Sequence, residues 1–164
     1  MQLWNPADGT RVRTLDTHPG EVYAACAVEA GGQTLLAVGG RSGTVHAVQL
    51  WNPADGTQVR TLDTRHEWTE ALCTVKTQGR TLLAAGCTRG KIRLWDLADG
   101  TETCTLDTVH DTIYAMCTVE AGGRTLLAAG GDGEVVQLWD PADGTCVLTV
   151  PMHHTVGIDR LADF

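Results

Sequence analysis

Short apolar runs separated by turn residues make up the C-terminal part of the chain, and their spacing indicates strands. The run TIYAMCTV at residues 112–119 alternates in side-chain type, as a strand with one buried face does. Further runs of β-forming residues follow at 125–130, 134–139 and 146–150. Glycine-rich and Asp-Gly segments, which favour tight turns, separate these runs. No stretch keeps a helical period, so the pattern predicts four antiparallel strands joined in order.

The same pattern repeats along the chain. The phrase LWNPADGT stands at residues 3–10 and 50–57, and close variants stand at 94–101 and 138–145. Its tryptophan recurs at intervals of 47, 44 and 44 residues, as Trp4, Trp51, Trp95 and Trp139. A period of this size describes one supersecondary unit, which buries its apolar face only by stacking on its neighbours.

The strand count, the period and the Trp-Asp pair at the end of the third strand resemble the WD-repeat β-propeller family. The phrases LWDPADGT and RTLLAAGGDGEVVQLWD are similar in particular to the highly regular bacterial members of that family. In that family each repeat is one four-stranded blade, and the blades form a ring around a central channel. The resemblance implies these structural signature residues: Trp4, Trp51, Trp95, Trp139, Asp96 and Asp140.

The hydrogen-bond network that this family buries beside its tryptophan is incomplete here. Among the aspartates that the family places after the second strand, only Asp132 is present. His18 and His153 align with the family's histidine before the inner strand, whereas His66 and His110 stand one residue late. We therefore expect apolar packing between neighbouring blades to stabilise the fold.

The position of the repeated phrase predicts how the chain divides into blades. Residues 2–15 would supply the two outer strands of a split blade, and residues 21–62, 68–106 and 112–150 three complete blades. Residues 154–164 would supply one inner strand of a split blade. We therefore expect an all-β fold: a WD-repeat β-propeller arc of three complete four-stranded blades plus parts of a fourth, closed by oligomerisation.

An open arc leaves the apolar faces of its terminal blades in water, which favours association. We expect the chain to bind itself, as a head-to-tail homodimer that closes an eight-bladed ring. The alternatives are a four-bladed monomer, a larger ring, a sensor part cut from a larger bacterial signalling protein, and a fragment of a longer propeller or a designed or duplicated sequence whose only function is self-assembly.

Charge and cysteine usage narrow the function classes. With 20 acidic against 12 basic residues, the chain lacks the footprint of a nucleic-acid-binding protein. No apolar run long enough for a membrane span and no leader-like pattern occurs. Cys26, Cys73 and Cys117 share one repeat position inside apolar runs, which predicts buried thiols. The absence of a C-x-x-C pair argues against zinc, so we expect no metal, no cofactor and a reducing, cytoplasmic compartment.

The loops before the inner strands and after the second strands differ between repeats, which favours them as a binding face for a protein or peptide. Trp68 is the leading candidate, because Glu21 and Thr112 hold its position in the other repeats and tryptophan is a typical interface anchor. Packing against the neighbouring blade is the alternative for Trp68. The candidate residues are His18, Glu21, Arg41, Ser42, His66, Trp68, Arg89, His110 and Asp132.

Catalysis would have to use the histidines of His66-Glu67, His110-Asp111 and His153-His154. Equivalent loops of neighbouring blades lie well apart, and no nucleophile or carboxylate pair recurs with these histidines. We therefore expect a non-catalytic interaction scaffold.

Overall fold

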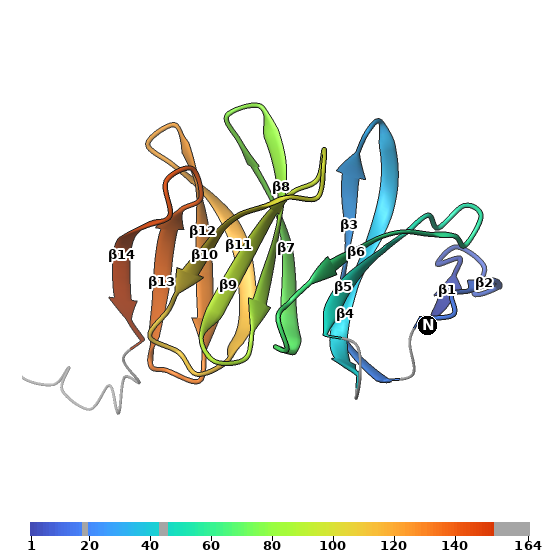
Figure 1. Cartoon of the computed structure of the whole chain (residues 1–164), viewed down its shortest axis with the longest axis horizontal. Coiled ribbons are helices and arrows are strands. Elements are labelled where there is room, and N and C mark those ends of the chain that lie inside the picture. Colours follow the sequence, from blue (N-terminus) through green and yellow to red (C-terminus); the bar gives the residue numbers. More distant parts are fainter. Residues whose placement is uncertain (18–19, 43–45, 153–164) are drawn as a thin grey trace, which may run out of the picture.

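The computed structural model describes residues 1–17, 20–42 and 46–152, which form β-strands joined by turns (Figure 1). Within each unit, strands that are neighbours in the sequence pair antiparallel, and the described residues form one two-stranded ribbon and three four-stranded sheets. The expected all-β class with four-stranded antiparallel sheets is confirmed. The described residues contain no helix of the length and apolar character needed to cross a membrane.

Each unit keeps its strands in chain order. The N-terminal ribbon consists of β1 (Gln2–Trp4) and β2 (Arg11–Thr14). The first sheet consists of β3 (Gly20–Ala30), β4 (Gln33–Ser42), β5 (Ala47–Trp51) and β6 (Gln58–Asp63). The second sheet consists of β7 (Thr69–Thr77), β8 (Arg80–Cys87), β9 (Lys91–Asp96) and β10 (Glu102–Asp107). The third sheet consists of β11 (Ile113–Ala121), β12 (Arg124–Gly131), β13 (Val135–Asp140) and β14 (Thr145–Pro151).

Two sequence expectations fall outside the described residues. The inner strand expected at 154–164 belongs to the C-terminal segment that the structure does not describe. The candidate His18, and His153, which aligns with it, also lie outside the described residues.

The repeated phrase forms the tight turn between the last two strands of each unit, which in the ribbon are β1 and β2. Asp140 accepts the backbone N–H of Ala142 at 3.0 Å. Gly144 completes this turn at φ +75°, a conformation that glycine adopts without strain. Asn52 accepts the N–H of Ala54 at 2.9 Å in the same way. The amide oxygen of Asn52 therefore accepts the same turn hydrogen bond as the carboxylate of Asp140. This equivalence explains why Trp-Asn can replace Trp-Asp in the repeat.

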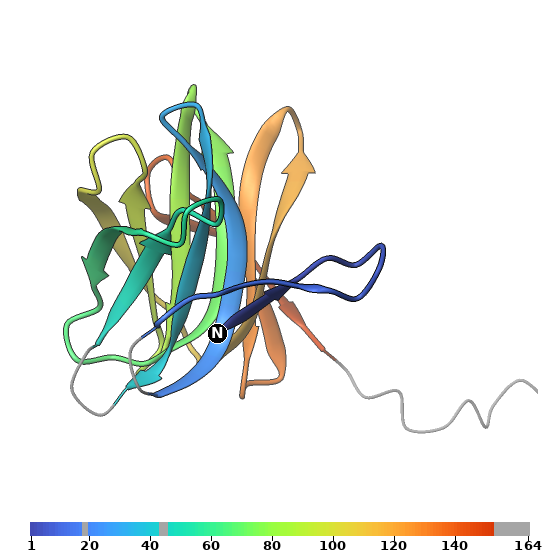
Figure 2. The same cartoon turned by 90° about the vertical axis from the view of Figure 1, so that its right-hand side faces the viewer.

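The sheets stand face to face, and an apolar core fills each seam between them (Figures 1 and 2). The inner strands β3, β7 and β11 pack side by side across these seams. In each core, the tryptophan of one unit lies with an apolar residue of the unit before it. The pairs are Trp51 with Leu15, Trp95 with Val28, and Trp139 with Val75. The chain thus builds the same kind of seam three times.

Candidate interaction surfaces

Trp68 lies at the seam between the first and second sheets. The guanidinium carbon of Arg41, in β4, lies 4.0 Å from the centroid of the Trp68 ring. The N–H of Trp68 donates to Thr88 Oγ1 at 3.2 Å, and the N–H of Thr88 donates to the Trp68 carbonyl at 3.0 Å. Trp68 is half-buried and Arg41 is exposed, so this cation–π pair closes the seam and leaves part of both residues accessible.

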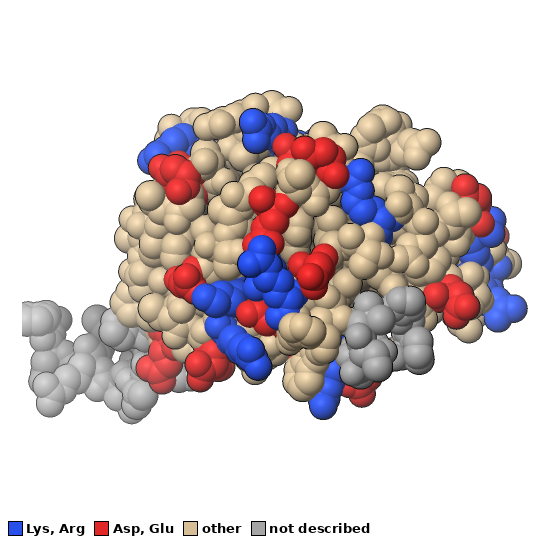
Figure 3. All heavy atoms as spheres, viewed as in Figure 1, with Lys and Arg blue, Asp and Glu red and all other residues tan. Residues whose placement is uncertain are grey.

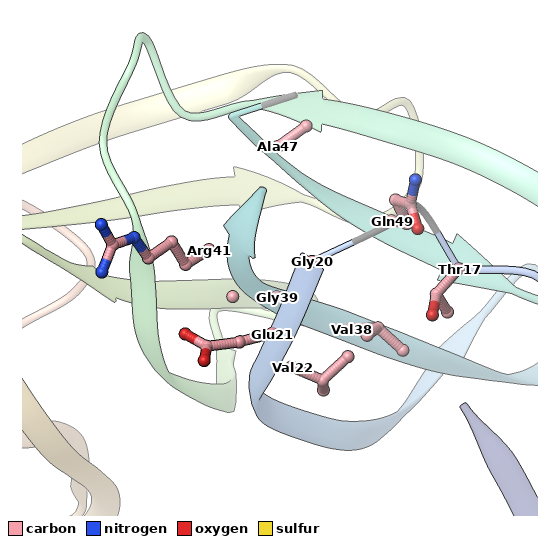
Figure 4. A pocket seen from close by; sticks show the side chains of 10 residues that line it. Thr17, Gly20, Glu21, Val22, Val38, Gly39, Arg41, Ala47 and Gln49 are labelled. Atoms are coloured by element: carbon pink, nitrogen blue, oxygen red, sulfur yellow. The ribbon is translucent and has the colours of Figure 1, made fainter. Parts of the chain in front are cut away.

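Acidic and aromatic side chains of β3 and β7 surround this pair. Glu21 lies opposite Arg41 in the strand register and accepts the hydroxyl hydrogen of Tyr23, which raises the pKa of that hydroxyl. Burial raises the pKa of Glu70, and the positive charge of Arg41 opposes that shift. Glu21 and Arg41 line a cavity of about 30 Å³ (Figure 4). Such a volume holds about one water molecule, so this cavity is too small for an organic ligand.

The structure buries His110 beneath the loop face on which it was expected. Its side chain is 0% exposed, and its Nδ1 accepts the N–H of Gly133 at 3.1 Å. Asp132 Oδ1 lies 4.0 Å from the same nitrogen and accepts the N–H of Asp111 at 2.9 Å. Within the described residues, His110 Nε2 and Trp139 Nε1 are buried without a hydrogen-bond partner. His110 and Asp132 therefore fasten the loop before β11 to the turn after β12.

His66 and Arg89 lie on exposed turns of the second sheet. Both take the left-handed backbone conformation, at φ 70° and 63° respectively. The ring of His66 stands edge-on to the ring of His46, with the centroids 5.3 Å apart. The side chain of the remaining candidate, Ser42, is outside the described part of the structure.

A buried ion-pair network in the second sheet was missed by the sequence analysis. Arg93 Nε lies 3.0 Å from Glu67 Oε2, and Arg93 Nη1 lies 2.9 Å from Glu102 Oε1. Burial acts to lower the pKa of Arg93, but the two carboxylates raise it above its ordinary value. The first and third sheets carry Gln49 and Gln137 at this repeat position. An arginine where the other repeats have glutamine was therefore the available signal.

The signature aspartates lie at the opposite end of the sheets from the loop face. Asp96 Oδ2 is 3.8 Å from Arg80 Nη1, and Asp140 Oδ2 is 3.2 Å from Arg124 Nη1. Asp96 borders a groove of about 530 Å³, and Asp140 borders one of about 270 Å³ at the next seam. Since equivalent residues line a groove at both seams, the stacking of the sheets accounts for these grooves.

The signature tryptophans identify the uncovered face at the start of the stack. Trp51, Trp95 and Trp139 are 5%, 2% and 7% exposed, whereas Trp4 is 56% exposed. Each buried tryptophan packs against the unit before its own. Among the described residues no unit precedes the ribbon, so Trp4 has no such cover.

The third sheet has the complementary uncovered face. Val28 and Val75 are 1% and 0% exposed, whereas Val119 at the same repeat position in β11 is 38% exposed. On the outer strands, Leu106 is 3% exposed and its equivalent Val150 in β14 is 38% exposed. Figure 3 shows charges of both signs over the second sheet, while the surface at β13 and β14 is largely uncharged.

The three cysteines at one repeat position also change from partly buried in the first two sheets to exposed in the third sheet. Cys26 and Cys73 are partly buried, and burial raises the pKa of both thiols to about 11. Cys117 is exposed, so the prediction of a buried thiol is wrong there, because none of the described residues forms a further sheet over β11. No group of three His, Cys, Asp or Glu side chains that would hold a metal ion occurs in the described ranges.

No protein-family model and no curated protein sequence matches the chain. Its structure is similar to the crystal structure of Ika8, a computationally designed protein, with a TM-score of 0.71 and 17% sequence identity. The match covers 93% of this chain and 43% of that protein, so the chain spans less than half the length of Ika8. At this identity the likeness establishes the fold alone.

Proposed function

We propose that this chain is a non-catalytic propeller arc whose function is to assemble with a second copy of itself. One observation carries the proposal: positions buried at every internal seam are exposed at the two ends of the stack. Trp4 at one end, and Val119 and Val150 at the other, are the two halves of one further seam. Burying a large apolar side chain contributes about 1.5–3 kcal/mol, so closing this seam is favourable.

The structural similarity to Ika8 supports the proposed self-assembly, because the two proteins share a fold and Ika8 is about twice as long. The chain corresponds to 43% of that designed protein, and a second copy would supply a comparable share. A head-to-tail homodimer is therefore the assembly that we favour, with eight blades if the split blade of residues 2–15 is completed at each junction. The repeat period and the Trp-Asp pairs support placing the chain with WD-repeat propellers.

Light scattering over a range of concentrations tests the proposal. We expect a mass of twice 17.5 kDa for the unmodified chain. Val150→Glu should shift the chain to monomer, because it places a charge in the new seam. Val147→Glu is the matched control, since Val147 lies on the same strand and its equivalents Val12 and Val59 are 61% and 50% exposed. A monomeric unmodified chain at all concentrations overturns the proposal.

A second candidate function is binding of a partner protein at the loop face. The accessible Arg41–Trp68 pair favours it, because Trp and Arg are enriched among the residues that dominate interface energetics. Affinity capture with the unmodified chain and with Trp68→Ala separates the two functions. Capture of only the chain itself supports assembly alone, whereas a partner lost with Trp68→Ala but kept with Val150→Glu supports the loop face.

A further inference from the structure

Outer strands reach forward to the next sheet at the internal seams. Arg13 of β2 donates from Nη1 to the carbonyl of Asp55 at 2.9 Å and from Nη2 to that of Ala54 at 2.7 Å. Arg60 of β6 donates from Nη1 to the carbonyl of Leu97 at 3.4 Å. In both cases the acceptors belong to the tight turn of the following sheet. At these two seams, one outer-strand arginine thus holds its unit to the turn of the next.

The glycines of these turns lie close to outer-strand side chains of the preceding unit. A Cβ atom on Gly100 would lie 2.7 Å from Arg60 Cδ, and one on Gly144 would lie 3.3 Å from Leu106 Cδ2. A Cβ atom on Gly9 would have no heavy atom within 4 Å. Among the described residues, the turn around Gly9 is therefore the one copy that no outer strand covers.

Within the part of the chain that the structure describes, β14 is the outer strand that no turn of a following sheet contacts. Leu148 holds the repeat position of Arg13 and Arg60 and is 51% exposed. Cys104, at the same position in the second sheet, has its Sγ 3.9 Å from the Cβ position of Gly144. An apolar side chain therefore already fills the latch position at one internal seam, so Leu148 suits the same role.

We propose that the N-terminal turn (residues 5–10) of one copy docks against β14 of a second copy, with Leu148 packed over Gly9. This inference rests on the proposed self-assembly and adds to it the direction and the contact. The occupant is a second copy because the contact continues, position by position, the latches already formed inside the chain. The free turn also offers the carbonyls of Ala7 and Asp8, the equivalents of those that Arg13 binds at Ala54 and Asp55.

A change of side chain at position 148 tests the contact through the dissociation constant of the assembly. Leu148→Arg restores the donor found in β2 and β6, and we expect association about tenfold tighter. Leu148→Glu places a carboxylate against carbonyl oxygens, and we expect association about tenfold weaker. Val147→Arg is the matched control and should leave the constant unchanged. Circular dichroism of each variant shows that the fold is kept.

Disulfide trapping between two differently substituted chains gives an independent test. The exposed Cys117 and Cys146 are first replaced by serine in every chain. In this background a mixture of Gly9→Cys and Leu148→Cys chains should form a linked dimer under mild oxidation, with the link mapped by mass spectrometry to the N-terminal turn and β14. A mixture of Gly9→Cys and Val147→Cys chains in the same background should not. The left-handed conformation at Gly9, φ +69°, strains a cysteine there, so the Leu148 series provides the complementary readout.

The outcomes separate the contact from the assembly. A chain that dimerises but shows neither the linked product nor any effect of Leu148→Arg and Leu148→Glu overturns the contact and leaves self-assembly standing. A chain that stays monomeric at all concentrations overturns both. Tighter binding of Leu148→Arg with the mapped link supports both.

Discussion

Glu67 Oε2 lies 3.0 Å from Arg93 Nε inside the second sheet, and both side chains are 7% exposed. Glu67 comes from the loop before β7 and Arg93 from β9, so the pair ties a loop to the middle of its own sheet. Removing one partner of a buried ion pair is strongly destabilising, because the other charge stays buried without full compensation. Without Glu67, the guanidinium of Arg93 would keep only the carboxylate of Glu102.

Glu67→Gln should therefore lower the free energy of unfolding by about 3 kcal/mol, because it leaves the buried guanidinium with one carboxylate. Urea unfolding measures this loss. The double change Glu67→Gln with Arg93→Gln reproduces the glutamine of the first and third sheets and should recover at least half of it. An unchanged midpoint for the single variant would contradict the role assigned to this pair.

Asp132 should matter as a hydrogen-bond acceptor. Its Oδ1 accepts the N–H groups of Asp111 at 2.9 Å and Thr112 at 3.3 Å. Asp132→Ala should cost about 1–2 kcal/mol in thermal unfolding, whereas Asp132→Asn keeps an acceptor oxygen and should cost less. Arg89→Ala, on the exposed turn of the second sheet, is the control and should change stability little. Equal losses for the alanine and asparagine variants would rule out the acceptor role.

The equivalent tryptophans should respond differently to truncation. Trp95→Ala should lower the free energy of unfolding by about 3–5 kcal/mol, because Trp95 is 2% exposed within a seam. Trp4→Ala should leave the unfolding of the isolated chain nearly unchanged, because Trp4 is 56% exposed. Its effect should appear as weaker association in light scattering. A large loss of stability for Trp4→Ala at high dilution would contradict the open end face.

The thiols should divide into reactive and protected groups. Burial raises the pKa of Cys87 to about 12, whereas Cys117 and Cys146 are exposed. Because the thiolate is the reactive form, iodoacetamide at pH 8 should label Cys117 and Cys146 in the folded chain and spare Cys87. All six cysteines should react in urea. Rapid labelling of Cys87 without denaturant would contradict its burial.

Because the pKa of the Cys87 thiol is raised in the folded chain, the free energy of unfolding depends on pH. The folded-state pKa of Cys87 lies above its unfolded value near 8.5, so its stabilising contribution is complete below that pH. The contribution is lost as the pH rises toward 12. Cys87→Ala should therefore flatten the decline of stability between about pH 9 and pH 11, measured by urea unfolding. An identical decline in both proteins would exclude Cys87 as its source.

Strand positions could be predicted because alternation and turn residues are local signals. The run expected at 125–130 is β12 (Arg124–Gly131), and the run expected at 146–150 is β14 (Thr145–Pro151). The turn chemistry of Asp-Gly was equally readable, since Gly144 takes a positive φ within its own turn.

Contacts between elements could not be predicted from local pattern. His110 precedes a strand in a loop, which suggests exposure, but the turn at Gly133 closes over its ring. Trp68 was expected either to bind a partner or to pack against a neighbour, and its position beside Arg41 is compatible with both. Arg93 was missed because its partners Glu67 and Glu102 come from two other segments of the sheet.

The two end faces expose different parts of the seam: Trp4 lies on one, and Val119 and Val150 lie on the other. An assembly built on them therefore has polarity, and each added copy regenerates the same two ends. Growth stops only if the accumulated rotation between sheets brings the last end back to the first. A chain with one blocked end, such as Val150→Glu, still offers its Trp4 face. In a mixture it would act as a chain terminator that joins from one side and admits no successor, so a small molar fraction would limit the length of any open polymer.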